Sequence, residues 1–328
     1  MSGSVLVTGG AGYIGSHAVL AMAEAGYDPI VLDDLSTGVR EAVPPGVAFF
    51  QGAAGDAVLI DEILDRHEIG AVAHFAGSIL APESIEAPRK YYLNNTVQTL
   101  ALLDRCIEAG IPQFIFSSTA AVYGEPRTNR LSEEASTVPI SPYGASKLFS
   151  ERMLSDAAAA HPGFRPVCLR YFNVAGADEE GRAGQRGVRR THLMAAAIDV
   201  ALGLRPHLDI YGADYDTRDG TCERDYIHVS DLADAHVAAL RYLEDDGEPA
   251  VMNCGAGAGY SVLEVVAALE AIIGRSLEVR WAGRRPGDPA RLLADASEIH
   301  RRLAWRATRS GLPEILDSAL RWRRDHPN

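Results

Sequence analysis

Three scarcities in the sequence exclude broad classes of protein. The four cysteines form no CxxC pair, and the ten histidines show no metal-ligand spacing, so we expect reduced thiols and no metal site. Basic residues number 31 against 44 acidic ones, and a net charge of −13 argues against nucleic acid and membrane partners. No apolar run approaches the length of a membrane span. We therefore expect a soluble, cytoplasmic protein.

The 328 residues are enough for two closely joined domains, and 47% hydrophobic with 23% charged residues is typical of a globular chain. The first half alternates short apolar runs with segments of helical spacing. The runs are VLVTG (5–9), PIVLDD (29–34), VAFFQG (47–52), AVAHFAG (71–77), QFIFSS (113–118) and PVCLRYF (166–172). This alternation predicts an α/β fold of the Rossmann type, a doubly wound parallel sheet with helices on both faces.

The composition and pattern of the sequence change after about residue 174. The stretch 173–187 is rich in glycine and charge and is predicted to be a loop, and THLMAAAIDVALG is predicted to be a helix. YIHV (226–229) and DLADAHVAALRYLE are predicted to return to the sheet as a strand and a helix. We therefore expect a dinucleotide-binding domain over 1–174, rejoined by a segment near 222–255, and a smaller C-terminal α/β substrate lobe within 175–328.

A glycine-rich turn links the first predicted strand to the first predicted helix. In VLVTGGAGYIGS, Gly9, Gly12 and Gly15 satisfy G-x-x-G-x-x-G, and Gly10 begins the alternative G-x-G-x-x-G. Side chains here would block the turn or the approach of a pyrophosphate, and the helix N-terminus attracts phosphate. Asp33 ends the second strand, where a carboxylate accepts from both ribose hydroxyls and repels a 2′-phosphate. The pattern predicts NAD rather than NADP.

SPYGASK (141–147) carries the candidate catalytic pair. Ser141 is predicted to cap a helix with Pro142 at its first position, which places Tyr143 and Lys147 four residues apart on one face. A free phenol has a pKa near ~10, and positive charge from Lys147 and an oxidised nicotinamide favours the phenolate. Thr119, at the end of a strand, could hydrogen-bond the same substrate hydroxyl. The motif is weak alone but strong after a dinucleotide fingerprint.

TGGAGYIGSH, DDLSTG, HFAG, YYLNNTV, FSSTAAVYG, SPYGASK, RYFNVAGA and RDYIHVSDLADAH together resemble the extended short-chain dehydrogenase/reductase family, and within it the UDP-glucose 4-epimerase family. The likeness runs over nearly the whole chain. It implies an isomerase in which bound NAD takes a hydride from C4 of a UDP-hexose and returns it to the other face, while Tyr143 takes the 4-hydroxyl proton. Lys147 and Thr119 would assist Tyr143, and no metal is implied.

The resemblance also implies contacts for cofactor and substrate. The cofactor contacts would be Gly9, Gly12, Tyr13, Ile14 and Gly15 at the pyrophosphate; Asp33, Asp34, Leu35, Ser36, Thr37 and Gly38 at the adenosine; and Phe75, Ala76, Gly77, Asn94, Ser117, Tyr143, Lys147 and Tyr171 elsewhere. The UDP-sugar contacts would be Thr119, Phe172, Asn173, His192, Leu193, Tyr211, Arg224, Arg285 and Asp288. Arg224 and Arg285 supply the local positive charge that a diphosphate needs, and Tyr211 would stack on uracil.

Departures from the family pattern affect the expected specificity. Ala53 replaces a family Asp at the adenine, and 78–89 contains no lysine where the family often has one. Leu292 falls near a position that sets sugar size in the family, and leucine there leaves UDP-N-acetylhexosamines open as substrates. His74 is expected to be packed rather than catalytic.

Other functions share parts of this pattern. A sugar-nucleotide 4,6-dehydratase or a UDP-glucuronate decarboxylase tends to carry carboxylates where this chain has Ala120 and Ala121. A non-catalytic NAD-binding regulator tends to lose the tyrosine or the lysine. A 4-epimerase of UDP-pentose or UDP-glucuronate stays open. Surplus apolar residues over about 88–109 and 143–160, which pair across a dimer in the family, predict a homodimer.

Overall fold

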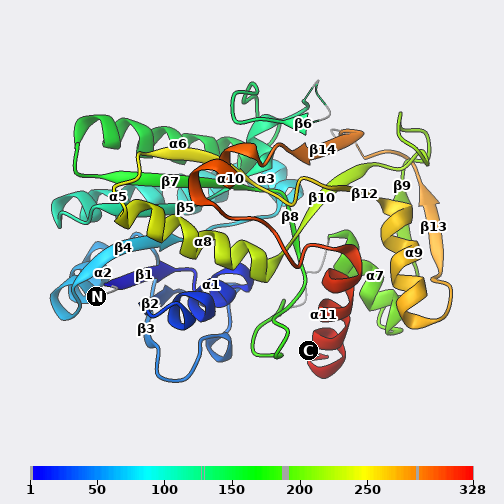
Figure 1. The fold of residues 1–328 in the computed structure, drawn as a ribbon, viewed down its shortest axis with the longest axis horizontal. Coiled ribbons are helices and arrows are strands. Elements are labelled where there is room, and N and C mark those ends of the chain that lie inside the picture. The colour runs from blue at the N-terminus through cyan, green and yellow to red at the C-terminus, as the bar shows by residue number, and fades with distance from the viewer. Residues whose placement is uncertain (1–2, 127, 129, 187–191, 286–287, 328) are drawn as a thin grey trace.

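The computed structural model describes residues 3–126, 128, 130–186, 192–285 and 288–327 (Figure 1). Its largest sheet, here the main sheet, runs in the order β11-β7-β5-β4-β1-β2-β3 with parallel neighbours throughout. Its strands are β1 (Ser4–Thr8), β2 (Asp28–Asp33), β3 (Ala48–Gln51), β4 (Ile69–His74), β5 (Gln113–Thr119), β7 (Arg165–Tyr171) and β11 (Ala250–Cys254). The six predicted apolar runs of the first half all form its strands, which confirms the predicted doubly wound α/β fold.

Helices cover both faces of the main sheet. Alternate residues of β1 face opposite sides, with Val5 and Val7 in one buried cluster and Leu6 in another. The first cluster lies under α1 (Tyr13–Glu24), α8 (Val229–Glu244) and α10 (Ser297–Leu303), and the second under α2 (Ala57–Arg66), α5 (Gln98–Glu108) and α6 (Pro142–Ala160). Figure 1 shows α1 and α8 crossing the front of the sheet.

The connection from β4 to α5 is irregular. The short helices α3 (Ala81–Glu86) and α4 (Pro88–Tyr91) lead into a π-helical turn over Tyr92–Val97, and only then does α5 begin. A π-turn inserts an extra residue and is frequent at functional sites. Short 3-10 turns also occur at Arg40–Ala42 and Ala120–Tyr123.

The smaller lobe contains the other strands and the remaining helices, at the right of Figure 1. One sheet has the order β12-β10-β14-β6 with β8 beside β10, and a ribbon pairs β13 with β9. The strands are β6 (Arg130–Leu131), β8 (Asn173–Ala175), β9 (Leu208–Tyr211), β10 (Glu223–His228), β12 (Gly259–Ser261), β13 (Val279–Ala282) and β14 (Arg291–Ala294). The helices are α7 (Leu193–Ala201), α9 (Val262–Ile273) and α11 (Leu312–Asp325).

Two expectations about this half are wrong. YIHV does not join the main sheet, because Tyr226–His228 pair with Asn173–Ala175 of β8. The stretch 173–187 is not wholly loop, since its first three residues form β8. The chain instead returns to the main sheet through α8 and β11. A division of the chain at residue 174 stays a prediction.

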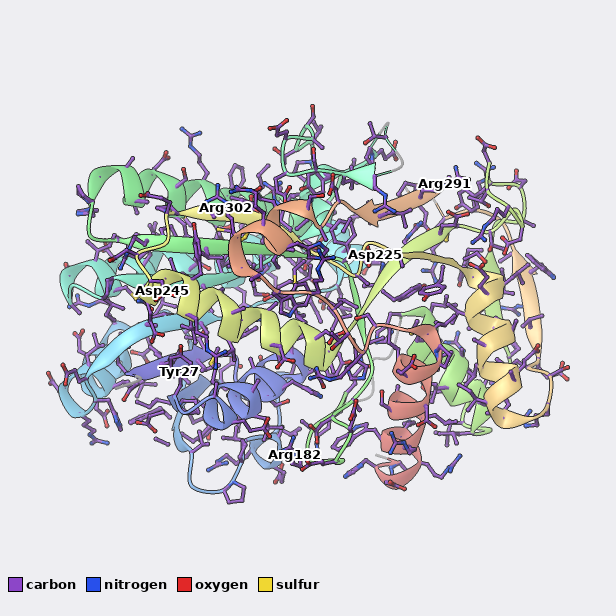
Figure 2. All side chains as sticks on the ribbon, viewed as in Figure 1. Tyr27, Arg182, Asp225, Asp245, Arg291 and Arg302 are labelled. Carbon is purple, nitrogen blue, oxygen red and sulfur yellow. The ribbon has the colours of Figure 1, made fainter. Side chains whose placement is uncertain are left out.

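Asp225 lies between the main sheet and the smaller lobe (Figure 2). Its fully buried carboxylate accepts from the backbone N–H groups of Ala256 at 2.8 Å, Gly257 at 2.9 Å and Ala294 at 3.2 Å. Burial raises the pKa of Asp225 to about 6, and the three N–H donors oppose that rise. One side chain thus ties the segment after β11 and the end of β14 to β10.

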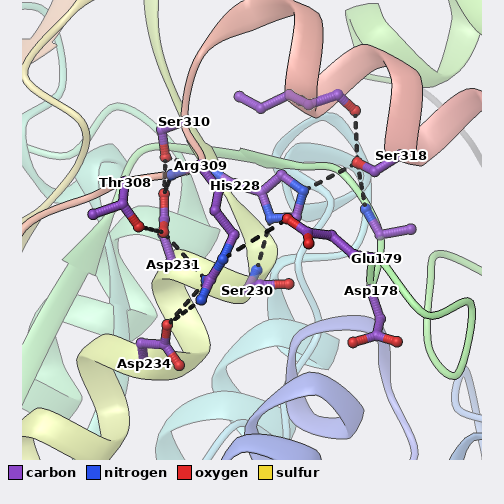
Figure 3. A network of polar contacts seen from close by, with 12 residues as sticks. Asp178, Glu179, His228, Ser230, Asp231, Asp234, Thr308, Arg309, Ser310 and Ser318 are labelled. Atoms are coloured by element: carbon purple, nitrogen blue, oxygen red, sulfur yellow. Dashed lines mark hydrogen bonds and ion pairs between the residues drawn. The ribbon is translucent and has the colours of Figure 1, made fainter.

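A second polar network ties the C-terminal segment to α8 (Figure 3). Asp231 accepts from the backbone N–H of Arg309 at 2.8 Å and from the Ser310 hydroxyl at 2.7 Å. His228 contacts the Ser318 hydroxyl at 3.0 Å, and that hydroxyl also accepts from the N–H of Ala177 at 3.2 Å. The network therefore fixes α11 and the chain after β8 in one place.

The described residues contain no helix that is long and apolar enough to span a membrane. All four cysteines, Cys106, Cys168, Cys222 and Cys254, are buried and free.

We expect Ile60→Ala to lower the free energy of unfolding by about 2 to 5 kcal/mol, because the side chain is 1% exposed and a cavity would remain. Val58→Ala on the same helix is the matched control, since Val58 is 80% exposed and the loss should stay within about 0.5 kcal/mol. Urea unfolding followed by circular dichroism measures both. Equal losses in the two variants would contradict the packing of α2 against the main sheet.

Candidate active site

The candidate active site lies at the carboxyl ends of the main-sheet strands. Because all strands are parallel, the loops after β1, β4, β5 and β7 meet at one edge. Ligands of doubly wound folds bind in the crevice outside this edge. The glycine turn follows β1, Thr119 ends β5, and Tyr171 ends β7. Residues far apart in the chain are therefore brought together.

The glycine turn has the backbone of a phosphate cradle. Gly9 has φ +74°, and a Cβ there would lie 2.6 Å from the backbone nitrogen of Ala76. A Cβ on Gly15 would overlap the carbonyl oxygen of Gly9. Gly12 caps α1 and brings no side chain to the N–H groups of the first turn. These N–H groups stay available to an anion, which fits the pyrophosphate of a dinucleotide.

Asp33 is positioned for a ribose. Its carboxylate accepts from the N–H of Ala11 at 2.9 Å and of Leu35 at 2.8 Å, which fixes it beside the glycine turn. Burial raises the pKa of Asp33, and the two N–H donors oppose that rise. Each oxygen keeps a lone pair for a hydroxyl donor. Of the predicted neighbours, Asp34, Ser36 and Thr37 are exposed, whereas Leu35 and Gly38 are partly buried.

The turn after β4 is held by the π-helical turn. Asn95 accepts from the N–H of Ser78 at 2.7 Å and donates to its carbonyl at 3.0 Å, while Asn94 donates to the Ser78 hydroxyl at 3.0 Å. Gly77 is thereby fixed so close to Lys147 that a Cβ would lie 3.6 Å from Nζ. Phe75 and Ala76 both donate backbone N–H groups to Thr8 at the end of β1.

The start of α6 matches its prediction. Ser141 caps the helix by accepting from the N–H of Gly144 at 3.2 Å, and Pro142 occupies the first turn. The side chains of Tyr143 and Thr119 interact, so the predicted base lies beside the residue predicted to bind the same substrate hydroxyl. Burial raises the pKa of Tyr143, and the hydrogen bond with Thr119 lowers it. Without a bound cofactor, burial has the larger effect on the pKa of Tyr143. A Tyr143 phenolate at neutral pH therefore requires added positive charge.

Lys147 is a buried cation. Its side chain is 3% exposed, its Nζ donates to the carbonyl of Ser117 at 2.8 Å, and Nζ lies 4.8 Å from the centre of the Phe116 ring. Burial lowers the pKa of Lys147 to about 8, and the carboxylate of Glu151 opposes that fall. Lys147 is thus still largely protonated at neutral pH.

Tyr171 belongs to the same buried centre. Its hydroxyl hydrogen-bonds the Ser117 side chain and lies 2.5 Å from Nε2 of His236. Nδ1 of His236 is 2.8 Å from the carbonyl of Leu232, which only accepts, so Nε2 is the acceptor of the Tyr171 proton. Sequence analysis did not find His236. Figure 1 shows why, since α8 lies across the main sheet although it is distant in sequence.

His74 is packed, as predicted. Its ring contacts the hydroxyls of Thr8 at 2.5 Å and Thr99 at 2.8 Å and is 1% exposed. Burial lowers the pKa of His74 to about 3, and the charge of Lys147 lowers it further. Among the described residues, no group of three or more histidine, cysteine or carboxylate side chains could hold a metal ion.

Several predicted substrate residues lie on β8, β9 and β10 and among the described residues just before β14. Asn173 donates to the carbonyl of Asp225 at 3.0 Å, and Arg224 forms an ion pair with Asp288. The guanidinium of Arg285 lies 3.7 Å from the centre of the Tyr211 ring and covers one face of that ring. These contacts bring both predicted diphosphate arginines to the lobe side of the site.

Other predicted residues are turned elsewhere. Phe172 is buried in a cluster with Tyr123 and Leu131. His192 is exposed, with Nε2 2.8 Å from Gln185, and Leu193 begins α7. The hydroxyl of Tyr13 donates to the carbonyl of Gly176 at 2.7 Å, and Ile14 packs against the core beneath the glycine turn.

Glu151 and Arg170 are further buried residues that sequence analysis missed. They form an ion pair one turn beyond Lys147. The available signal was the spacing of Glu151, four residues after Lys147, in a helix whose face toward the main sheet is otherwise apolar or small.

The fold and this geometry define a dinucleotide-binding protein with a tyrosine–lysine pair at the cofactor edge. The family model described as "NAD dependent epimerase/dehydratase family" matches residues 5–255, and the chain belongs to this family.

Relatives and solved structures agree with this assignment. A UDP-glucose 4-epimerase of Azospirillum brasilense is 55% identical over 98% of this chain and 92% of its own length. The structure of UDP-glucose 4-epimerase from Brucella ovis in complex with NAD has a TM-score of 0.94 and 43% identity, covering 98% of each chain. The UDP-Glc/GlcNAc 4-epimerase of Campylobacter jejuni has a TM-score of 0.87 and 44% identity, covering 99% of this chain and 100% of that one.

We expect Gly15→Ala to weaken NAD binding at least about tenfold, or 1.4 kcal/mol, because the added methyl overlaps the Gly9 carbonyl and distorts the cradle. Titration calorimetry on protein stripped of nucleotide measures the affinity. Gly163→Ala is the control, since its Cβ meets nothing within 4 Å. Unchanged affinity in a Gly15→Ala protein with normal circular dichroism would contradict the cradle.

Proposed function

We propose that this protein is an NAD-dependent 4-epimerase of UDP-hexoses that interconverts UDP-glucose and UDP-galactose. The observation that carries the proposal is the buried centre in which Tyr143 meets Thr119 one helical turn from the Lys147 cation. The glycine turn and Asp33 support NAD as the cofactor. The similarity to UDP-glucose 4-epimerases over nearly the whole chain supports the UDP-hexose substrate.

NAD supplies a hydride acceptor and donor and, when oxidised, a positive charge. Tyr143 accepts the proton of the sugar 4-hydroxyl, and Thr119 orients that hydroxyl. Lys147 stabilises the phenolate electrostatically from within the protein. When the 4-keto sugar has turned over in the site, Tyr143 returns the proton to the 4-oxygen, and bound NAD would supply the hydride to the other face of C4.

Arg224 and Arg285 hold the diphosphate, and Asn173 orients it. In the described structure Asp288 neutralises Arg224, so substrate binding replaces a carboxylate with phosphate oxygens and leaves Asp288 free for the uridine ribose. Uracil stacks on the face of Tyr211 opposite Arg285.

Other chemistries of the same fold are disfavoured. The 3-10 turn after Thr119 begins with Ala120 and Ala121, so the positions where a dehydratase carries its acid and base hold methyl groups. UDP-N-acetylhexosamine is the second candidate substrate. Leu292 lies directly beside Arg224 in the neighbouring strand, and the similar Campylobacter jejuni protein is a UDP-Glc/GlcNAc 4-epimerase. The four free, buried cysteines favour a reducing compartment such as the cytoplasm.

The test is incubation of the purified protein with UDP-galactose, UDP-N-acetylgalactosamine, UDP-xylose and UDP-glucuronate in separate reactions. We expect UDP-glucose from UDP-galactose, and Tyr143→Phe should lower kcat at least about a hundredfold while leaving NAD bound. Separation of the product sugars by anion exchange and the absorbance of bound NADH give the readouts. No 4-epimer from any substrate would sink the epimerase proposal, and normal turnover by Tyr143→Phe would remove the proposed base.

We also propose a homodimer through α5 and α6. These helices pack side by side, with the π-helical turn before α5 also against α6, and Leu93 and Val97 of that turn, Leu100 of α5 and Phe149 of α6 are about half exposed. The first three are spaced four and three residues apart, which suits one continuous apolar strip. An exposed apolar strip on two adjacent helices matches a four-helix contact between two copies of the chain.

A charge in this strip should dissociate the dimer. We expect Leu100→Glu to sediment as a monomer of about 35 kDa, as the composition gives for one chain, because an unpaired carboxylate would be buried at the contact. Leu204→Glu is the control, since Leu204 is similarly exposed in the smaller lobe. Sedimentation velocity distinguishes the outcomes, and a monomeric unmodified protein would count against the dimer.

A further inference from the structure

The proposed function leaves a buried ion pair unused. Glu151 follows Lys147 by one turn of α6 and receives two hydrogen bonds from Arg170, with Nε at 3.0 Å and Nη2 at 2.7 Å. Glu151 is 6% exposed and Arg170 5%. The Ser118 hydroxyl donates to the same carboxylate. Both charges thus lie inside the protein, directly behind the catalytic centre.

This ion pair belongs to a polar row that crosses three strands. Arg170 on β7 is paired in register with Ser118 on β5 and with Asn253 on β11. Its Nη1 donates to the Tyr123 hydroxyl at 2.9 Å, and that hydroxyl donates to Asn253 at 2.7 Å. The row therefore locks the Glu151 carboxylate in a single position under α6.

Stability does not account for this arrangement. Removing two charges from water costs several kcal/mol per ion, and well-packed apolar residues often replace a buried pair without loss of stability. The pair does, however, place a fixed carboxylate near Lys147, whose own burial disfavours its charge. At low effective dielectric such a carboxylate acts strongly on a neighbouring ammonium group.

The other titratable groups around Lys147 do not supply the negative charge that would keep it protonated. Burial keeps Tyr143 and Tyr171 neutral, and Cys168 on β7 is a buried thiol whose pKa is raised well above its usual value. From β4, His74 is neutral, and from α4, Tyr91 hydrogen-bonds Glu83 and meets Tyr143 edge to face. Arg170 carries the opposite charge. Of these groups, Glu151 is the one that raises the pKa of Lys147 most.

We propose that Glu151, fixed by Arg170 and Ser118, is a positioning residue that keeps Lys147 a cation beside Tyr143. The inference rests on the proposed role of the tyrosine–lysine pair. Glu151 touches neither substrate nor cofactor and acts through Lys147 alone. Its removal changes the pH at which the pair works, rather than only the amount of folded protein.

The direction of the expected pH shift follows from the titration of Lys147. Lys147 loses its charge as pH rises through its pKa of about 8, so activity falls on the alkaline side. Without the Glu151 charge that pKa falls, and the alkaline limb of kcat moves to lower pH. A nearby charge typically shifts a pKa by one unit or more, so we expect Glu151→Gln to move the limb by at least about one pH unit.

A second readout does not depend on turnover. The ultraviolet difference absorbance between a protein and its Tyr143→Phe counterpart, titrated with base, isolates the Tyr143 phenolate. In the Glu151→Gln background we expect this phenolate to form at higher pH, because Lys147 is less often charged. Asp199→Asn, which breaks the partly buried ion pair with Arg323 in the smaller lobe, is the matched control and should shift neither curve.

The outcomes separate the two proposals. Inactivity of the unmodified protein on every UDP-sugar defeats the proposed function, while the phenolate titration still tests Glu151. An active protein whose Glu151→Gln variant has a lower kcat but an unchanged pH profile and phenolate titration overturns the positioning role. Where Glu151→Gln fails to fold, the double variant Glu151→Gln, Arg170→Gln removes both charges of the pair. We expect its alkaline limb of kcat to move to lower pH as well, by a smaller amount. No shift in that folded double variant also overturns it.

Discussion

The burial of the Lys147 ammonium group at the carboxyl edge of a parallel sheet is the constraint on which the site depends. A desolvated cation needs fixed acceptors, and the end of β5 supplies the Ser117 carbonyl at 2.8 Å. α6 must therefore start at this edge, and its Ser141 cap fixes where it starts. Once the lysine is placed, Tyr143 lies one turn earlier and meets Thr119 at the end of the same strand.

The second requirement is that the smaller lobe is held rigidly opposite this edge of the main sheet. Asp225 and the network of His228 and Asp231 join β8, β10, β14 and α11 to the layers of the main sheet. Because these groups are buried and hydrogen-bonded, the smaller lobe holds Asn173 and Arg224 at a fixed place beside the cofactor edge. The dinucleotide cradle and the diphosphate arginines are thus built by different parts of the chain and related by these polar junctions.

Local patterns predicted most strands of the main sheet and both residues of the catalytic pair, Tyr143 and Lys147. Short apolar runs predict parallel strands because both faces of such strands are covered, and Ser-Pro predicts a helix start because each residue satisfies the first turn. The π-turn at Tyr92–Val97 was missed because its residues have ordinary helical composition. β10 was placed in the wrong sheet because a buried strand has the same apolar sequence in either sheet.

The sequence by itself determined the family, the glycine cradle, the Asp33 carboxylate and the spacing of Tyr143 and Lys147, since each depends on residues close together in the chain. Tertiary structure alone decided which distant groups meet them. It placed His236 against Tyr171, Asp288 against Arg224 and the Glu151–Arg170 pair behind Lys147. Charge and burial at a site are sums over several strands and helices, and no local pattern of residues contains that sum.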